Sequence, residues 1–272
     1  MATVADSGVG KNKTDFSGSP IASAIDRWIY VYMAASFVVI TLTGFIPDSI
    51  AKIAAVNAGE RPPFPLALHF HAVLMGSFLL LVLAQTSLAA MGRFDLHRRL
   101  GPVAILLAPA LVIVGLILVP TIYHQVWNAA QNAPPGTKDK LQQAVLARDN
   151  IMLLQLRVGL LFPTFIFVGL RARTVDAGLH KRMMILATIV PLGAAFARIH
   201  WLPTTFPTSP LSSDIYLLLV SAPMFAWDLV RTRKVHRAYL IWIGFSLVAS
   251  VPLYAAWGSS WWHALAPRLM GV

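Results

Sequence analysis

The chain has 272 residues, of which 57% are hydrophobic and 12% charged, and its formal net charge is +11. A soluble domain of this length carries about twice that share of charged residues, so the composition indicates a membrane protein. The absence of cysteine excludes disulfides, thiolate metal sites, iron–sulfur clusters and cysteine nucleophiles.

The basic residues stand in short clusters between long apolar runs. This pattern is typical of membrane topology and of contact with anionic lipid headgroups at the cytoplasmic face, and it argues against a nucleic-acid partner. Residues 1–24 are predicted to form a disordered cytoplasmic tail, because the polar N-terminus lacks the apolar core of a cleaved signal peptide.

Seven segments meet or approach the roughly 20 apolar residues that a helix needs to cross a bilayer. They are Trp28–Ile46, Leu66–Met91, Pro102–Tyr123, Ile151–Leu170, Met183–Trp201, Ile215–Val230 and Ala238–Trp257. The sequence therefore predicts an all-α bundle of seven transmembrane helices over residues 25–258, followed by a short periplasmic tail, 259–272. Pro47-Asp48 is expected to end the first span, and residues 137–148 to form a short surface helix.

The distribution of lysine and arginine predicts the orientation of the bundle. Fourteen of the 22 lie on one predicted side, six on the other and two within spans. The richer side should be cytoplasmic, which places the N-terminus inside and the C-terminus outside a bacterial inner membrane. Three turns on that side contain a similar short motif. Such a weak internal repeat is compatible with one leading helix followed by three helical hairpins. The motifs are Leu96-His97-Arg98, Leu179-His180-Lys181 and Val235-His236-Arg237.

Histidines near the outer ends of the spans are candidate ligands. His71, His124 and His200 come from three helices at similar depth, where neutral imidazoles could bind a haem iron or a metal ion. For any one of them, simple solvation at the interface is the alternative interpretation.

Two arginines fall within predicted spans, Arg157 and Arg198. A charge there costs about 2.5–3.5 kcal/mol on insertion scales, so it usually faces a partner or a watery cavity. Snorkelling to the interface would also explain Arg198. Asp214 could pair with either arginine, and the remaining positive charge would suit haem propionates, a lipid headgroup or a small carboxylate.

Several motifs resemble those of known membrane proteins. His69-Phe70-His71-Ala72, then Gln85, then His97-Arg98-Arg99-Leu100-Gly101 resembles a group of functionally uncharacterised, polytopic inner-membrane proteins of bacteria. A fainter similarity is to haem-bearing membrane reductases, which share a His-Arg-x-Leu-Gly turn. Those reductases carry a further histidine along the same helix, where this chain has Leu111.

Four functional hypotheses follow from these residues. The leading one is a b-type haem or quinone-linked redox protein, with His71 and either His124 or His200 as axial ligands and Arg157 and Arg198 holding the propionates. The second is a carrier or lipid-modifying protein that binds an anion at the two arginines. The others are a copper or zinc site made of histidines, and a structural or assembly subunit without a ligand.

Overall fold

The computed structural model describes residues 19–272, which form helices and connecting turns without a strand. Its helices are α1 (Pro20–Asn57), α2 (Leu66–Ala90), α3 (Phe94–Leu100), α4 (Pro102–Gln131), α5 (Pro135–Ala172), α6 (Ala177–Ile189), the 3₁₀ turn η2 (Val190–Leu192), α7 (Gly193–Phe196), α8 (Leu211–Thr232), α9 (Arg237–Ala256) and α10 (Ser260–Leu269). Seven stretches of this described part are long and apolar enough to cross a membrane, α3–α4 and α6–α7 each counting as one. The predicted seven-helix bundle is confirmed, and the protein is a multi-pass membrane protein.

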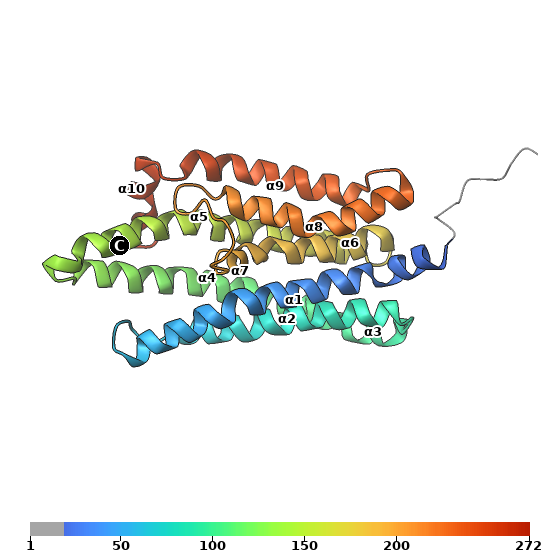
Figure 1. Ribbon diagram of the computed structural model, residues 1–272, viewed down its shortest axis with the longest axis horizontal. Coiled ribbons are helices and arrows are strands. Elements are labelled where there is room, and N and C mark those ends of the chain that lie inside the picture. The colour runs from blue at the N-terminus through green and yellow to red at the C-terminus, as the bar shows by residue number, and fades with distance from the viewer. Residues whose placement is uncertain (1–18) are drawn as a thin grey trace, which may run out of the picture.

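The spans alternate in direction along the bundle (Figure 1). The turns α2–α3, α5–α6 and α8–α9 lie at the same end as the start of α1, and we call this the basic end. The α1–α2 and α4–α5 connections and α10 lie toward the other end, called here the opposite end. Because α2 and α5 both start there, these two helices run in the same direction.

Helix α5 occupies a central position, since it packs against α4, α6, α9 and α10. The most enclosed span is the one that begins with α6, while apolar side chains on the outer helices remain exposed, such as Leu106 (74%) and Val248 (73%). In water such faces would be costly, but in a bilayer they contact lipid.

Helices α1 and α5 are longer than the sequence predicts. Pro47 does not end the first span, because α1 continues for three more turns to Asn57. The expected surface helix 137–148 is instead the first part of α5, which has no break before Ala172. In both cases the continuous run of helix-forming residues outweighs the local turn signal, and the helices project beyond the predicted spans.

The ends of the described chain are also helical. Ser19 caps α1 by accepting a hydrogen bond from the Ala22 amide, so residues 20–24, assigned by the sequence to the tail, belong to the first helix. Residues 1–18 of that predicted tail lie outside the described residues. The 259–272 segment forms α10, which Ser259 caps at the Trp262 amide.

Candidate functional site

Arg148, on the part of α5 near the opposite end, has no carboxylate partner within the described chain. It is partly buried, its Nε is fully enclosed, and it forms no hydrogen bond or ion pair with any residue of the described chain. An enclosed polar group without a partner normally costs about 1–3 kcal/mol, and a charged one more. The position therefore calls for a group that the protein itself does not supply.

Further cations gather around Arg148. The positive charges of Arg198 and Arg61 act on Arg148, and the same two act on Lys52. We call Lys52, Arg61, Arg148 and Arg198 the cation cluster. Within it Asp48 accepts from Lys52 Nζ at 2.6 Å and from Arg198 Nε at 3.2 Å. Four cations against this one carboxylate leave three positive charges.

A close helix contact brings part of the cluster together. A Cβ on Gly44 of α1 would lie 2.3 Å from the Ala195 carbonyl oxygen, so only glycine permits this approach of α1 to α7. Asp48 lies one turn beyond Gly44, and Arg198 follows Ala195 by three residues. The Arg198 guanidinium is also held 4.5 Å from the Phe45 ring centroid. Arg198 is thus fixed by α1, whereas Arg148 is not fixed by a partner.

Two more unpaired polar atoms belong to residues of α2 and α5. The rings of Phe78 (α2) and Phe162 (α5) meet at 5.3 Å between centroids. His71 lies seven residues before Phe78 on α2, and Gln155 lies seven residues before Phe162 on α5. Seven residues are two turns, about 10 Å along a helix, so each polar residue is on the same face as the phenylalanine that follows it. The two helices are parallel, so His71 and Gln155 are displaced from the phenylalanines in the same direction. The His71 Nδ1 and Gln155 Oε1 atoms are enclosed and have no partner. We call these two residues the inner polar pair, and Arg148 precedes Gln155 by another seven residues.

The structure separates the two arginines that the sequence grouped. Arg198 belongs to the cation cluster, but Arg157 lies nine residues after Arg148 and so on the opposite face of α5. There it donates to both carboxylate oxygens of Asp214, at 2.5 and 3.1 Å, and to Ser250 Oγ at 3.0 Å. Tyr254 also donates to Asp214. The predicted pairing with Asp214 is confirmed for Arg157, and it neutralises this arginine.

The three predicted ligand histidines do not form a cluster. Within residues 19–272 no group of three or more histidine, aspartate or glutamate side chains is placed to hold a metal ion. His71 is in the inner polar pair, His124 Nε2 lies 2.6 Å from the Met270 carbonyl oxygen, and His200 is exposed after α7. The sequence predicted a shared layer because the three histidines have similar depth. Depth alone does not decide whether a side chain points toward the other two.

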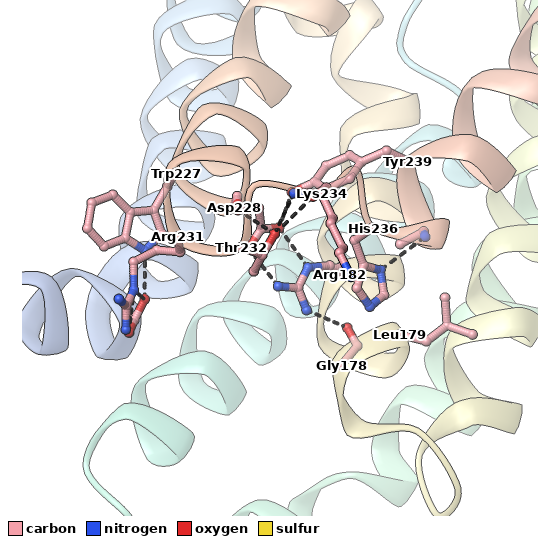
Figure 2. A network of polar contacts seen from close by, with 12 residues as sticks. Gly178, Leu179, Arg182, Trp227, Asp228, Arg231, Thr232, Lys234, His236 and Tyr239 are labelled. Atoms are coloured by element: carbon pink, nitrogen blue, oxygen red, sulfur yellow. Dashed lines mark hydrogen bonds and ion pairs between the residues drawn. The ribbon is translucent and has the colours of Figure 1, made fainter. Parts of the chain in front are cut away.

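A second buried ion pair, near the basic end, was missed by the sequence analysis. Arg182 on α6 donates to both carboxylate oxygens of Asp228 on α8, at 2.7 and 2.6 Å, and to the Gly178 carbonyl at 3.0 Å (Figure 2). Tyr239 donates to the same carboxylate at 2.5 Å. Both charged residues are less than 9% exposed. Like Arg157, Arg182 is matched, so this network holds α6, α8 and α9 together.

Residues of the candidate site escaped the sequence analysis for a definite reason. Lys52, Arg61 and Arg148 were counted only as basic residues of the opposite side, because Lys52 and Arg148 were placed outside the predicted spans and Arg61 lies in the connection between α1 and α2. The spacing of Arg148, Gln155 and Phe162 by seven would have marked one face of a long helix. No family model, curated protein or solved structure matches this chain.

Proposed function

We propose that this multi-pass membrane protein is a carrier or lipid-modifying protein that binds an anionic ligand at the cation cluster. The ligand carries a phosphate or carboxylate group, which Arg148 receives together with Arg61 and Arg198. The single observation that carries the proposal is Arg148, which has an enclosed Nε and no partner, and on which the charges of two further arginines act. Guanidinium groups suit phosphate and carboxylate because their forked donors match both anions.

The distribution of charge supports an outward-facing site. On the proposed orientation the basic end is cytoplasmic, and the opposite end is poor in lysine and arginine. Three of its six basic residues nevertheless belong to the cation cluster: Lys52, Arg61 and Arg148. A few charges concentrated at one point favour a binding site over topology as their explanation.

The inner polar pair extends the proposed site toward the middle of the bundle. His71 and Gln155 each offer a polar atom without a partner, and Gln155 lies two turns along α5 from Arg148. A ligand with an anionic head and a further hydroxyl or carbonyl group would satisfy both levels. The haem or quinone hypothesis and the copper or zinc hypothesis at His71, His124 and His200 stay predictions, and no observation favours them over anion binding.

The test compares binding of two probes that share the phosphate group. Purified protein is placed in nanodiscs of phosphatidylcholine with or without phosphatidylglycerol, and in a second series inorganic phosphate is titrated into phosphatidylcholine discs. We expect one probe to raise the melting temperature of the wild type and Arg148→Ala to abolish the rise. Stabilisation by phosphatidylglycerol alone would identify a lipid headgroup, and stabilisation by phosphate would identify a soluble anion.

The matched control is Arg268→Ala, which removes an exposed arginine of α10 near the same end. It should keep the full response, because Arg268 lies outside the cation cluster. An equal loss in both variants would show nonspecific charge attraction and contradict the proposal. So would a wild type that responds to neither phosphate, phosphatidylglycerol nor a small carboxylate such as citrate.

A further inference from the structure

Two histidines near the basic end adopt the same local geometry. His97 Nδ1 lies 3.1 Å from the Gln85 carbonyl oxygen, and His180 Nδ1 lies 2.8 Å from that of Gly169. A carbonyl oxygen can only accept, so Nδ1 carries the proton in each ring and Nε2 presents a lone pair. A bond from one ring nitrogen to a backbone carbonyl is also what orients metal-binding histidines.

The two imidazoles lie close together, one on α3 and the other on α6. Their ring centroids are 6.5 Å apart and their planes are nearly perpendicular, at 87°. Neither Nε2 has a hydrogen-bond partner within the described part of the chain. The separation is close to the roughly 6 Å expected when two imidazoles bind one ion from opposite sides with bonds of about 2.0–2.1 Å.

A third acceptor belongs to the same place. Gln85 Nε2 donates to the His97 carbonyl oxygen at 3.2 Å, which fixes the orientation of the amide. Its Oε1 is enclosed and has no donor. Three acceptor atoms on neighbouring residues therefore have no proton donor within the described chain, and a bound cation would satisfy them.

We propose that His97 and His180 bind one Cu(I) ion through their Nε2 atoms, with Gln85 beside it. Imidazole is a common ligand of copper, zinc, iron and nickel. The positive charge of Arg173 acts on His180, and Arg98 and Arg99 are exposed nearby, so an ion of single charge is favoured over Zn²⁺. Two nitrogen ligands also suffice for Cu(I), and this site does not depend on the proposed anion site.

The experiment is a competition for Cu(I) between the full-length protein in detergent and the chelator bicinchoninate, under ascorbate. We expect about one Cu(I) per chain, and at least a tenfold weaker affinity in His97→Ala and in His180→Ala. The matched control is His236→Ala, from the third turn. His236 Nδ1 differs, because it accepts from the Ala238 amide and caps α9. This variant should keep the wild-type affinity.

X-ray absorption of the copper-loaded wild type provides a test that does not require a mutant to fold. Two nitrogen neighbours with imidazole scattering would support the site, and sulfur neighbours or the absence of imidazole scattering would overturn it. A wild type that does not compete with the chelator would also overturn it. So would folded His97→Ala and His180→Ala variants with unchanged affinity, or a preference for Zn²⁺ over Cu(I).

Discussion

Arg148 and Arg157 stand nine residues apart on α5 and have opposite surroundings. Arg157 is 9% exposed and is held by Asp214 and Ser250, while Arg148 has an enclosed Nε and no partner. The same helix thus carries Arg157, whose charge is neutralised by a carboxylate, and Arg148, whose charge has no partner within the described chain. Arg157 therefore has a structural partner within the fold, whereas Arg148 has none and is a candidate site residue.

Arg182 extends the comparison to the basic end. Its fork meets both oxygens of Asp228, and Tyr239 completes the carboxylate's partners. The network joins residues of three helices, and its one positive and one negative charge neutralise each other. The cation cluster also draws on separate elements, but it keeps three positive charges in excess. The difference predicts opposite responses to substitution.

The largest effect is expected when the Arg182–Asp228 pair is broken. Asp228→Asn keeps the shape but leaves the buried guanidinium without its counter-charge, and we expect a loss of about 3–5 kcal/mol of unfolding free energy. Denaturant unfolding in detergent, followed by tryptophan fluorescence, measures it. The double variant Arg182→Met/Asp228→Leu should recover much of the loss. A loss below about 1 kcal/mol would contradict a structural role for the pair.

A smaller loss is expected at Arg157. Asp214→Asn leaves the guanidinium with Ser250 and with the amide oxygen, and the Asp214 side chain is 22% exposed, so about 2 kcal/mol is expected. The same unfolding assay applies. Anion binding at the cation cluster should stay unchanged, because Arg157 faces the other side of α5. A variant that lost anion binding while it remained folded would move the site to Arg157.

The seven spans could be predicted because each depends on the composition of one segment. Apolar runs separated by polar, proline-rich or basic connections determine the number of spans, whatever their partners. The exact helix ends could not be predicted, because Pro47 is compatible with either a stop or a kink. If the helix stopped at Pro47, Asp48 and Lys52 would be loop residues. Because the helix continues, they lie on one face of α1.

The candidate site was harder to predict because it depends on contacts between distant segments. Arg198 was found from its own position in a span, and His71 from its place near the outer end of a span. Arg61 and Arg148 look like ordinary boundary charges in the sequence, and only the folded structure brings the charges of Arg61 and Arg198 to act on Arg148. The direction in which a helix face points is a tertiary property, and this is also why Arg157 was grouped with Arg198.

A substitution in the cation cluster should raise the unfolding free energy, whereas a substitution in either buried ion pair lowers it. Arg148→Met removes a charge that the unliganded protein holds without a partner, so we expect a gain of roughly 1 kcal/mol in unfolding free energy in phosphatidylcholine discs. The same variant should lose its response to the anionic probe. Arg268→Met serves as the control and should change neither quantity. A loss of more than about 2 kcal/mol would show that Arg148 has a structural partner after all.

The smallest effect concerns the one carboxylate of the cluster. Asp48→Asn raises the excess charge from three to four, so the anionic probe should bind several-fold more tightly at low ionic strength, with the gain fading as salt is added. Asp176→Asn is the control at the basic end. The Leu179 amide and Arg237 hold the pKa of Asp176 below its usual range, so it is ionised at neutral pH and the variant removes the same unit charge. If both variants tightened binding equally, the cause would be net charge alone. Tighter binding in Asp48→Asn only would show that the anion lies beside Asp48, as the unpaired cations of the cluster require.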